Sequence, residues 1–168
     1  MAEHEWTVAS ALIERDGQLL MVRNVRRGGV HDWSTPGGVI DADDPSILDG
    51  LTREVEEETG LIVRAWAGLV YEVVAVAPDM GWRMRCEVHL ATDVAGELCV
   101  EDPDGIVVEA GFHPPDRAEA LLATCPVWVR EPLAEWIAQR WMPTNDAHRQ
   151  FAYSVHGTRL AELRVERQ

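Results

Sequence analysis

Runs of β-forming residues recur along the first two thirds of the chain, and Gly, Pro and Asp separate them. Runs bounded in this way are typical of strands. Asp16-Gly17 is a turn signal, so the first two runs are predicted to form a hairpin. The Gly- and Pro-rich segment 26–38 is predicted to be a loop. The predicted strands are Trp6–Glu14, Gln18–Val25, Leu61–Val76 with a bend at 66–68, Arg83–Ala91 and Ile106–Phe112.

Helical patterns follow in three places. In Ser46–Thr59, apolar residues return every three or four positions and form one stripe. Ser46 followed by Asp49 is a capping pattern, and Gly60 stands where a helix commonly ends. Asp116–Ala123 and Val127–Trp141 are also predicted to be helices. Strands and helices in this mixed order indicate an α+β domain, with a mixed sheet and helices on both faces.

The last segment allows two interpretations. The polar stretch Pro143–Gln150 is predicted to be a connection. The residues after it alternate around His156-Gly157, which favours a hairpin, and a helix from Thr158 onward is the alternative. In the hairpin, one face would carry Phe151, Tyr153 and Val155.

Charge and composition narrow the function. The 168 residues suffice for one domain with a core, and the net charge of −14 argues against a nucleic-acid polymer as partner. No apolar run approaches the ~20 residues that span a bilayer, and the N-terminus carries no secretory signal pattern. We therefore expect a cytoplasmic protein without a membrane partner. The three cysteines, Cys86, Cys99 and Cys125, are expected to be free thiols.

The predicted helix 46–59 carries an unusual acidic run. At about 100° per residue, Glu54, Glu57 and Glu58 share one face beside the apolar stripe, and Glu56 points into solvent. A solvated acidic face is one interpretation. The other is a hard-metal site, because partly buried carboxylates that repel one another need a cation, and Mg²⁺ prefers oxygen ligands. Gly50 leaves space on the same face, and Arg53 can reach Glu57.

Together with Pro36-Gly37-Gly38 upstream, this helix closely resembles the Nudix box, G-x5-E-x7-R-E-U-x-E-E-x-G-U, in which U is bulky and aliphatic. The leading glycine is Gly38, and the second half of the motif matches at Arg53, Glu54, Val55, Glu57, Glu58, Gly60 and Leu61. Two features depart from the pattern. Asp44 replaces the first glutamate, and eight residues separate it from Arg53 where the motif has seven. These departures put the role of the first glutamate in doubt.

The resemblance implies an α/β/α sandwich and a pyrophosphohydrolase that cleaves a nucleoside diphosphate linked to another moiety. By position, Glu54, Glu57 and Glu58, with the Gly38 carbonyl, would bind Mg²⁺ or Mn²⁺. Arg53 would orient the three glutamates and complete the catalytic set. The general base is left open among Glu57, Glu101 and Glu109. The Nudix domain is expected at 1–142, and 143–168 as an extension packed on it or in a homodimer contact.

The substrate-binding candidates lie mostly around the Pro-Gly-Gly segment. Arg23 and Arg26 could bind phosphates, and Trp33 could stack on a nucleotide base. Glu109, already a candidate for the general base, is also predicted to bind the substrate. The alternative for the arginines and Glu109 is a surface position that only aids solubility, and the alternative for Trp33 is packing in the core. A nucleoside triphosphate, oxidised forms included, is the first substrate expected. ADP-ribose or another nucleoside diphosphate sugar is the second, and a non-catalytic nucleotide-binding domain is the third possibility.

Overall fold

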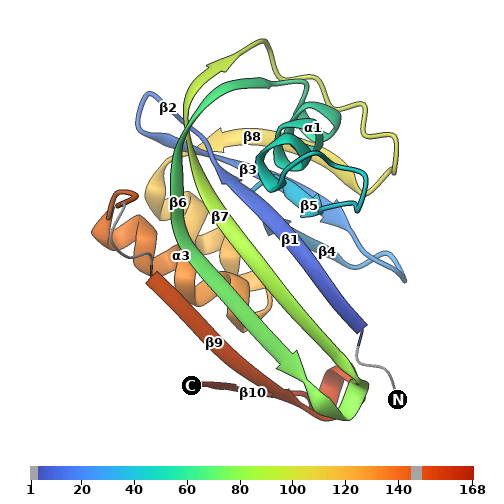
Figure 1. Ribbon diagram of the computed structural model, residues 1–168. Helices are drawn as coiled ribbons and strands as arrows, with labels where there is room; N and C mark the ends of the chain where they lie inside the picture. Colours follow the sequence, from blue (N-terminus) through green and yellow to red (C-terminus); the bar gives the residue numbers. More distant parts are fainter. Residues whose placement is uncertain (1–3, 145–148) are drawn as a thin grey trace.

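The computed structural model describes residues 4–144 and 149–168 and contains two β-sheets with helices packed against them (Figure 1). The larger sheet has the strand order β10-β9-β6-β7-β1-β5. Strand β1 runs parallel to β7 and β9 runs parallel to β6, whereas the other neighbours are antiparallel. The sheet is therefore mixed, as predicted. Its strands are β1 (His4–Leu12), β5 (Gly37–Val39), β6 (Ile62–Ala77), β7 (Trp82–Ala95), β9 (Arg149–His156) and β10 (Arg164–Arg167).

The smaller sheet is built around β3 (Gln18–Val25), which pairs antiparallel with each of its other strands. These are β2 (Glu14–Arg15), β4 (His31–Ser34) and β8 (Val107–His113). The helices are α1 (Ile47–Thr59), α2 (Pro115–Leu121) and α3 (Val127–Gln139), with short 3₁₀ turns η1 (Pro78–Met80), η2 (Leu122–Thr124) and η3 (Leu160–Glu162). No helix within the described ranges is long and apolar enough to cross a membrane.

Two hydrophobic cores lie on opposite faces of the larger sheet. Leu51 and Val55 of α1 pack with Ala9 of β1 on one face. On the other face, Trp136 of α3 packs with Tyr153 of β9 and with the core residues of β6 and β7. Figure 1 shows α1 and α3 on opposite sides of the sheet. Helices therefore cover both faces, and the predicted sandwich architecture is confirmed.

The predicted hairpin between the first two strands is wrong in its extent. The turn at Asp16-Gly17 forms, but only Glu14 and Arg15 pair across it. Strand β1 pairs instead along its whole length with β7. The physical reason is that β1 contributes to both cores, so a central position in the larger sheet buries more of it than a hairpin would.

The predicted loop 26–38 contains two short strands, β4 and β5. Each is too short to show an alternating pattern, and each is held by its partner strand. Gly37 allows β5 to approach β1 closely, because a Cβ built on Gly37 would lie 2.1 Å from the Ala9 carbonyl oxygen. Tertiary pairing therefore overrides the Gly- and Pro-rich composition.

At the C-terminal end, the hairpin interpretation is confirmed. Strand β10 pairs antiparallel with β9 around Gly157, and the described residues from Thr158 onward form the 3₁₀ turn η3 and strand β10 in place of an α-helix. The connection predicted at Pro143–Gln150 lies partly outside the described residues, and its last two residues already belong to β9. The side chains of Phe151, Tyr153 and Val155 are buried together on one face, as predicted.

Candidate active site

Helix α1 is defined by local signals at both ends. The Ser46 hydroxyl oxygen accepts a hydrogen bond from the Asp49 amide at 3.1 Å, which satisfies one free donor of the first turn. At the other end, Gly60 adopts a left-handed φ of 74° and donates its amide to the Glu56 carbonyl. The buried Leu51 and Val55 fix which face of the helix meets the core. Their position determines where the glutamates point.

The four glutamates of α1 divide as the helical wheel predicts. The exposed fractions of the side chains are 14% for Glu54, 34% for Glu57 and 8% for Glu58. Glu56 is exposed. Three carboxylates are therefore partly or fully withdrawn from water beside the core, where their charges are costly without a compensating cation.

Arg53 lies among these carboxylates and binds several of them. Its Nη1 donates to Glu54 Oε1 at 2.8 Å and to Glu57 Oε2 at 3.1 Å. Its Nε and Nη2 donate to the two carboxylate oxygens of Asp44 at 3.2 and 3.0 Å. These contacts raise the pKa of Arg53, with the Asp44 hydrogen bond as the largest cause. Arg53 is thus fixed as a permanent cation against the glutamate face.

Glu58 links the helix to strand β5. Its Oε2 accepts the Gly37 amide at 2.9 Å. Gly38 is packed against the neighbouring glutamate, since a Cβ built there would lie 2.6 Å from Glu54 Oε2. Burial raises the pKa of Glu58 to about 8, and the nearby charges of Glu54 and Asp102 act in the same direction. Burial also raises the pKa of Glu54.

The donor set suits a hard divalent cation. It includes the carboxylates of Glu54 and Glu58, whose pKa values are raised chiefly by burial and further by neighbouring acidic groups. Carboxylate oxygens are the ligands that Mg²⁺ and Mn²⁺ take. Within residues 4–144 and 149–168, however, no three acidic, His or Cys side chains are already grouped as a metal site. Arg53 donates to Glu54 and Glu57 in this arrangement, so these two carboxylates would have to turn from it toward a cation.

The loop between β7 and β8 brings further acidic groups to the same side. Asp102 accepts the amides of Asp104, Ile106 and Val107, which closes the loop. The negative charge of Asp102 raises the pKa of Glu58, and that of Asp104 raises the pKa of Glu54. Glu101, a predicted candidate in this loop, is exposed, and neither aspartate was predicted from the sequence, although Asp-Pro-Asp-Gly is a recognisable turn signal.

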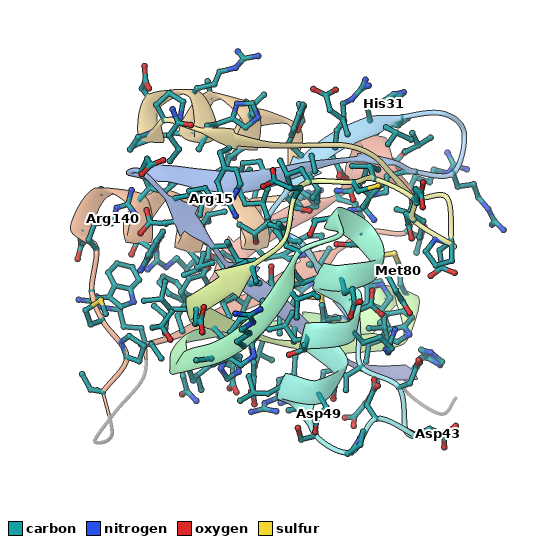
Figure 2. The ribbon with its side chains drawn as sticks, turned by 90° about the horizontal axis from the view of Figure 1, so that it is seen from above. Arg15, His31, Asp43, Asp49, Met80 and Arg140 are labelled. Atoms are coloured by element: carbon teal, nitrogen blue, oxygen red, sulfur yellow. The ribbon has the colours of Figure 1, made fainter. Side chains whose placement is uncertain are left out.

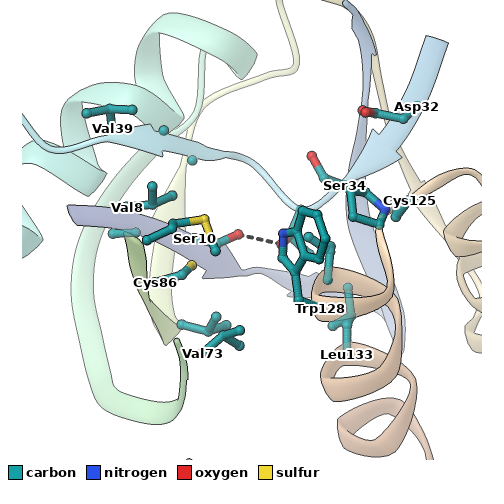
Figure 3. Close-up of a pocket in the computed structure, with 18 of the residues that line it drawn as sticks. Val8, Ser10, Asp32, Ser34, Val39, Val73, Cys86, Cys125, Trp128 and Leu133 are labelled. Atoms are coloured by element: carbon teal, nitrogen blue, oxygen red, sulfur yellow. Dashed lines mark hydrogen bonds between the residues drawn. The ribbon is translucent and has the colours of Figure 1, made fainter. Parts of the chain in front are cut away.

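A cavity of about 330 Å³ adjoins this face and shares Gly37 and Gly38 with it. Figure 3 shows it between β1 and β5 on one side and β4 with the start of α3 on the other. The floor is apolar and is made by Val73, Met84, Cys86 and Val88. Trp128, in the first turn of α3, projects into it (Figure 3). An apolar cavity with an aromatic side chain suits a planar ring system.

One wall of the cavity is polar. Asp32 and Ser34 of β4 line it together with Arg26. Arg26 binds both carboxylate oxygens of Asp32, at 2.8 and 3.1 Å. Behind them, the buried Asn24 donates to Asp32 at 2.9 Å and to Ser34 at 3.0 Å. The wall is therefore preorganised, because each polar side chain is held by another.

The Nudix domain family matches residues 3–161 of this sequence. The chain belongs to the Nudix family. A MutT-like protein from Streptomyces ambofaciens is 40% identical over 60 residues, which make up 36% of this chain and 36% of that relative. The chain thus aligns with about a third of the length of this curated relative. The expected family is confirmed.

Solved Nudix structures share the fold. The MutT Nudix hydrolase of Burkholderia pseudomallei is 26% identical with a TM-score of 0.60, over 74% of this chain and 100% of that one. The ORF135 protein of E. coli is 22% identical with a TM-score of 0.66, over 82% of this chain and 92% of that one. An ADP-ribose pyrophosphatase from Streptococcus suis is 20% identical with a TM-score of 0.52, over 86% of this chain and 98% of that one. At such identities the last two show the fold alone.

Not all the Nudix substrate-binding candidates reach the cavity. Arg26 lines it, but Trp33 lies at the alternate position of β4 and packs edge-on against His113, with ring centroids 5.4 Å apart. Arg23 and Glu109 face each other across β3 and β8 and pair at 2.9 Å, away from the cavity lining. Sequence reasoning missed Trp128, which follows Pro126 at the start of a helix and resembles an ordinary core residue there.

Proposed function

We propose that this chain is a Mg²⁺- or Mn²⁺-dependent pyrophosphohydrolase that cleaves nucleoside diphosphates linked to another moiety. The proposal rests on one observation. The partly buried glutamates of α1 and the cavity share the backbone of Gly37 and Gly38, so a ligand in the cavity would lie next to the carboxylates. A cation on Glu54, Glu57 and Glu58 would neutralise a pyrophosphate and activate water.

The chain's own residues divide the remaining work. Arg53 holds Glu54 and Glu57 in a common orientation. The Gly38 carbonyl is the proposed backbone ligand beside them. Glu57 is the first candidate for the general base, because it is the most exposed of the three glutamates and so the best placed to meet water.

Nucleoside triphosphates, oxidised forms included, are the proposed substrate class. The Trp128 side chain would stack on the base, while Asp32 and Ser34 would read its polar edge. Arg26 lines the cavity, and its charge lowers the pKa of Glu58, so it could also contact a phosphate held near that carboxyl. Both ends of a nucleotide would then find complementary groups.

A substrate panel tests this proposal. The protein is incubated with Mg²⁺ and with nucleoside triphosphates, their 8-oxo forms, ADP-ribose and nucleoside diphosphate sugars, and nucleoside monophosphate and pyrophosphate are measured. We expect metal-dependent turnover that is highest for a triphosphate. Higher turnover of ADP-ribose would reassign the substrate class. Tight nucleotide binding without turnover of any compound would identify a non-catalytic domain.

The site is tested separately with a matched pair of variants on the same helix. Glu57→Gln should lower kcat by about a hundredfold or more while the fold remains intact. Glu56→Gln makes the same chemical change at an exposed position and should retain full activity. Wild-type turnover by Glu57→Gln would refute the assignment of this face.

A further inference from the structure

Asp44 is the residue at which this chain departs from its family motif. It replaces a glutamate with a side chain one methylene shorter, and one additional residue separates it from Arg53. A shorter acid in a longer segment would be expected to lose contact with the helix. The structure shows the opposite, because the Asp44 side chain is only 10% exposed and binds Arg53 through both carboxylate oxygens.

The turn before α1 holds the Asp44 carboxylate in place. The Asp44 amide donates to the Asp41 carbonyl at 3.1 Å, and the Asp41 amide donates to Asp44 Oδ2 at 2.9 Å. Asp44 Oδ2 therefore receives one hydrogen bond from the loop and another from Arg53. Of the contacts that lower the pKa of Asp44, the hydrogen bond from Arg53 is the largest.

Gly50 makes room for this carboxylate. A Cβ built on Gly50 would lie 2.6 Å from Asp44 Oδ2 and 2.9 Å from Asp44 Cγ, closer than nonbonded atoms approach. A glycine in the middle of a helix is otherwise unfavourable relative to alanine. Its absence of a side chain lets the shorter acid lie directly against the helix backbone, one turn before Arg53.

We propose that Asp44 and Gly50 act as a pair that anchors Arg53, so that Asp44 is a positioning residue for the glutamate face. Arg53 shares its donors between Asp44 and the two glutamates Glu54 and Glu57. When those glutamates turn toward a cation, Asp44 keeps the guanidinium beside them. This last step rests on the proposed function, whereas the anchoring of Arg53 does not.

A thermal double-mutant cycle without metal tests the pair. Gly50→Ala should lower the Tm of the wild type, because the new methyl group displaces the Asp44 carboxylate. In an Asp44→Ala background the same change should raise the Tm, because the carboxylate is gone and alanine favours the helix. The change of sign is the expected signature of the pair.

Ile40 supplies the competing explanation for the glycine. Its Cδ1 would lie 3.0 Å from the same Cβ, so a clash with Ile40 could also make alanine unfavourable at position 50. That clash would lower the Tm equally in both backgrounds. An equal decrease in both, or an equal increase in both, would overturn the proposed pair.

Metal affinity gives a second readout that a purely structural role would not change. Mn²⁺ binding is titrated by electron paramagnetic resonance without substrate. Asp44→Ala and Gly50→Ala should each weaken binding by roughly tenfold, as is common when the partner of a metal ligand is lost. Asp43→Ala is the matched control, because Asp43 is exposed in the same loop and points outward (Figure 2).

The outcomes separate the two proposals. If Asp44→Ala and Asp43→Ala bind Mn²⁺ as tightly as the wild type, Asp44 does not position the metal face and the inference fails. If the wild type itself does not bind Mn²⁺, the proposed function fails in its metal requirement. In that case the thermal cycle still decides whether Asp44 and Gly50 anchor Arg53, because it requires no metal.

Discussion

Two arginine-centred clusters in this protein differ in charge balance. At α1, Arg53 faces Asp41, Asp44, Glu54 and Glu57, and the neighbouring Glu58 extends this cluster, so carboxylates outnumber the single cation. On the larger sheet, Arg85 pairs with Glu72 and Glu87, and His89 contacts Glu87 at 2.8 Å. On the sheet, two carboxylates share an arginine and a histidine, whereas at α1 all the carboxylates share one arginine.

The pKa shifts of one buried carboxyl in each cluster show the consequence. Burial raises the pKa of Glu58, and neighbouring acids raise it further. Burial acts in the same direction on Glu87, but the His89 and Arg85 contacts outweigh it, and its pKa is lowered. The contacts of Glu87 therefore stabilise its ionised form, whereas burial and neighbouring acids disfavour the ionised form of Glu58.

Removing one buried charge from each cluster should give opposite phenotypes. Glu58→Gln is expected to lower turnover by about a hundredfold, because it replaces a carboxylate of the proposed metal face with a neutral amide. Glu87→Gln should retain most turnover and lower the Tm. Steady-state kinetics and thermal melts on both variants provide the measurement. Equal loss of turnover in the two variants would remove the functional distinction between the clusters.

Removing the central cation should destabilise the sheet cluster more. Arg85→Ala leaves the buried Glu72 without its 2.7 Å donor and is expected to reduce the free energy of unfolding by about 2 kcal/mol. Arg53→Ala should cost less stability and more activity, because two of its partners, Glu57 and Asp41, are 34% and 68% exposed, whereas Glu72 and Glu87 are only 8% and 12% exposed. Urea unfolding measures both variants, and a larger loss of stability in Arg53→Ala would contradict the comparison.

Stability without metal should depend on pH in opposite directions for the two carboxyls. Since the folded-state pKa of Glu58 is raised from 4.5 to about 8, the folded protein holds this proton more tightly than the unfolded chain. This contribution to stability is lost as pH rises from about 4.5 to 8. The lowered pKa of Glu87 gives a contribution that is present above 4.5 and lost as pH falls below it.

The Tm of each variant across pH 3–9 tests this contrast. Glu58→Gln should flatten the decline of the wild-type Tm toward pH 8, and Glu87→Gln should reduce the decline on the acid side. Saturating Mg²⁺ should also flatten the decline of Tm toward pH 8, because a bound cation favours the ionised carboxylate. A wild-type Tm that rises between pH 5 and 8 without metal would contradict the sign derived for Glu58.

The exposed pair Arg23–Glu109 provides a third arginine–glutamate contact and the smallest expected effect. The two side chains are 36% and 51% exposed, so solvent screens their attraction. A double-mutant cycle with alanine at both positions should give a coupling energy of about 0.5 kcal/mol or less, without loss of turnover. A coupling as large as that between Arg85 and Glu72 would show that burial does not govern these pairs.

The sequence predicted the glutamate face because its determinants are local. Ser46 and Gly60 set the ends of α1, and the helical repeat then fixes which glutamates converge. The cavity wall depends instead on tertiary arrangement, because β4 pairs with β3 and its side chains meet those of β1 and α3 around the cavity. Without knowledge of β4, the alternation that places Asp32 inside and Trp33 outside could not be deduced.

The same distinction explains the other residues that were missed. Trp128 reaches the cavity only because α3 packs across the face of β6 and β7. Asp102 comes near Glu58 through a loop that follows β7. A single sequence shows neither approach, because nothing within a few residues of these positions indicates which distant element they will meet.

The parallel pairing of β9 with β6 has a consequence for how the protein assembles. One edge of β6 pairs with β7, the next strand along the chain. The other edge pairs with β9, and its paired residues Glu72 and Gln150 are 78 positions apart in the sequence. Strands that are far apart in the sequence pair late in folding, so during folding β6 presents an unpaired edge with largely apolar side chains. Such an edge can pair with another copy of the chain. Refolding yield should therefore fall as protein concentration rises, and late closure of this edge would set that limit.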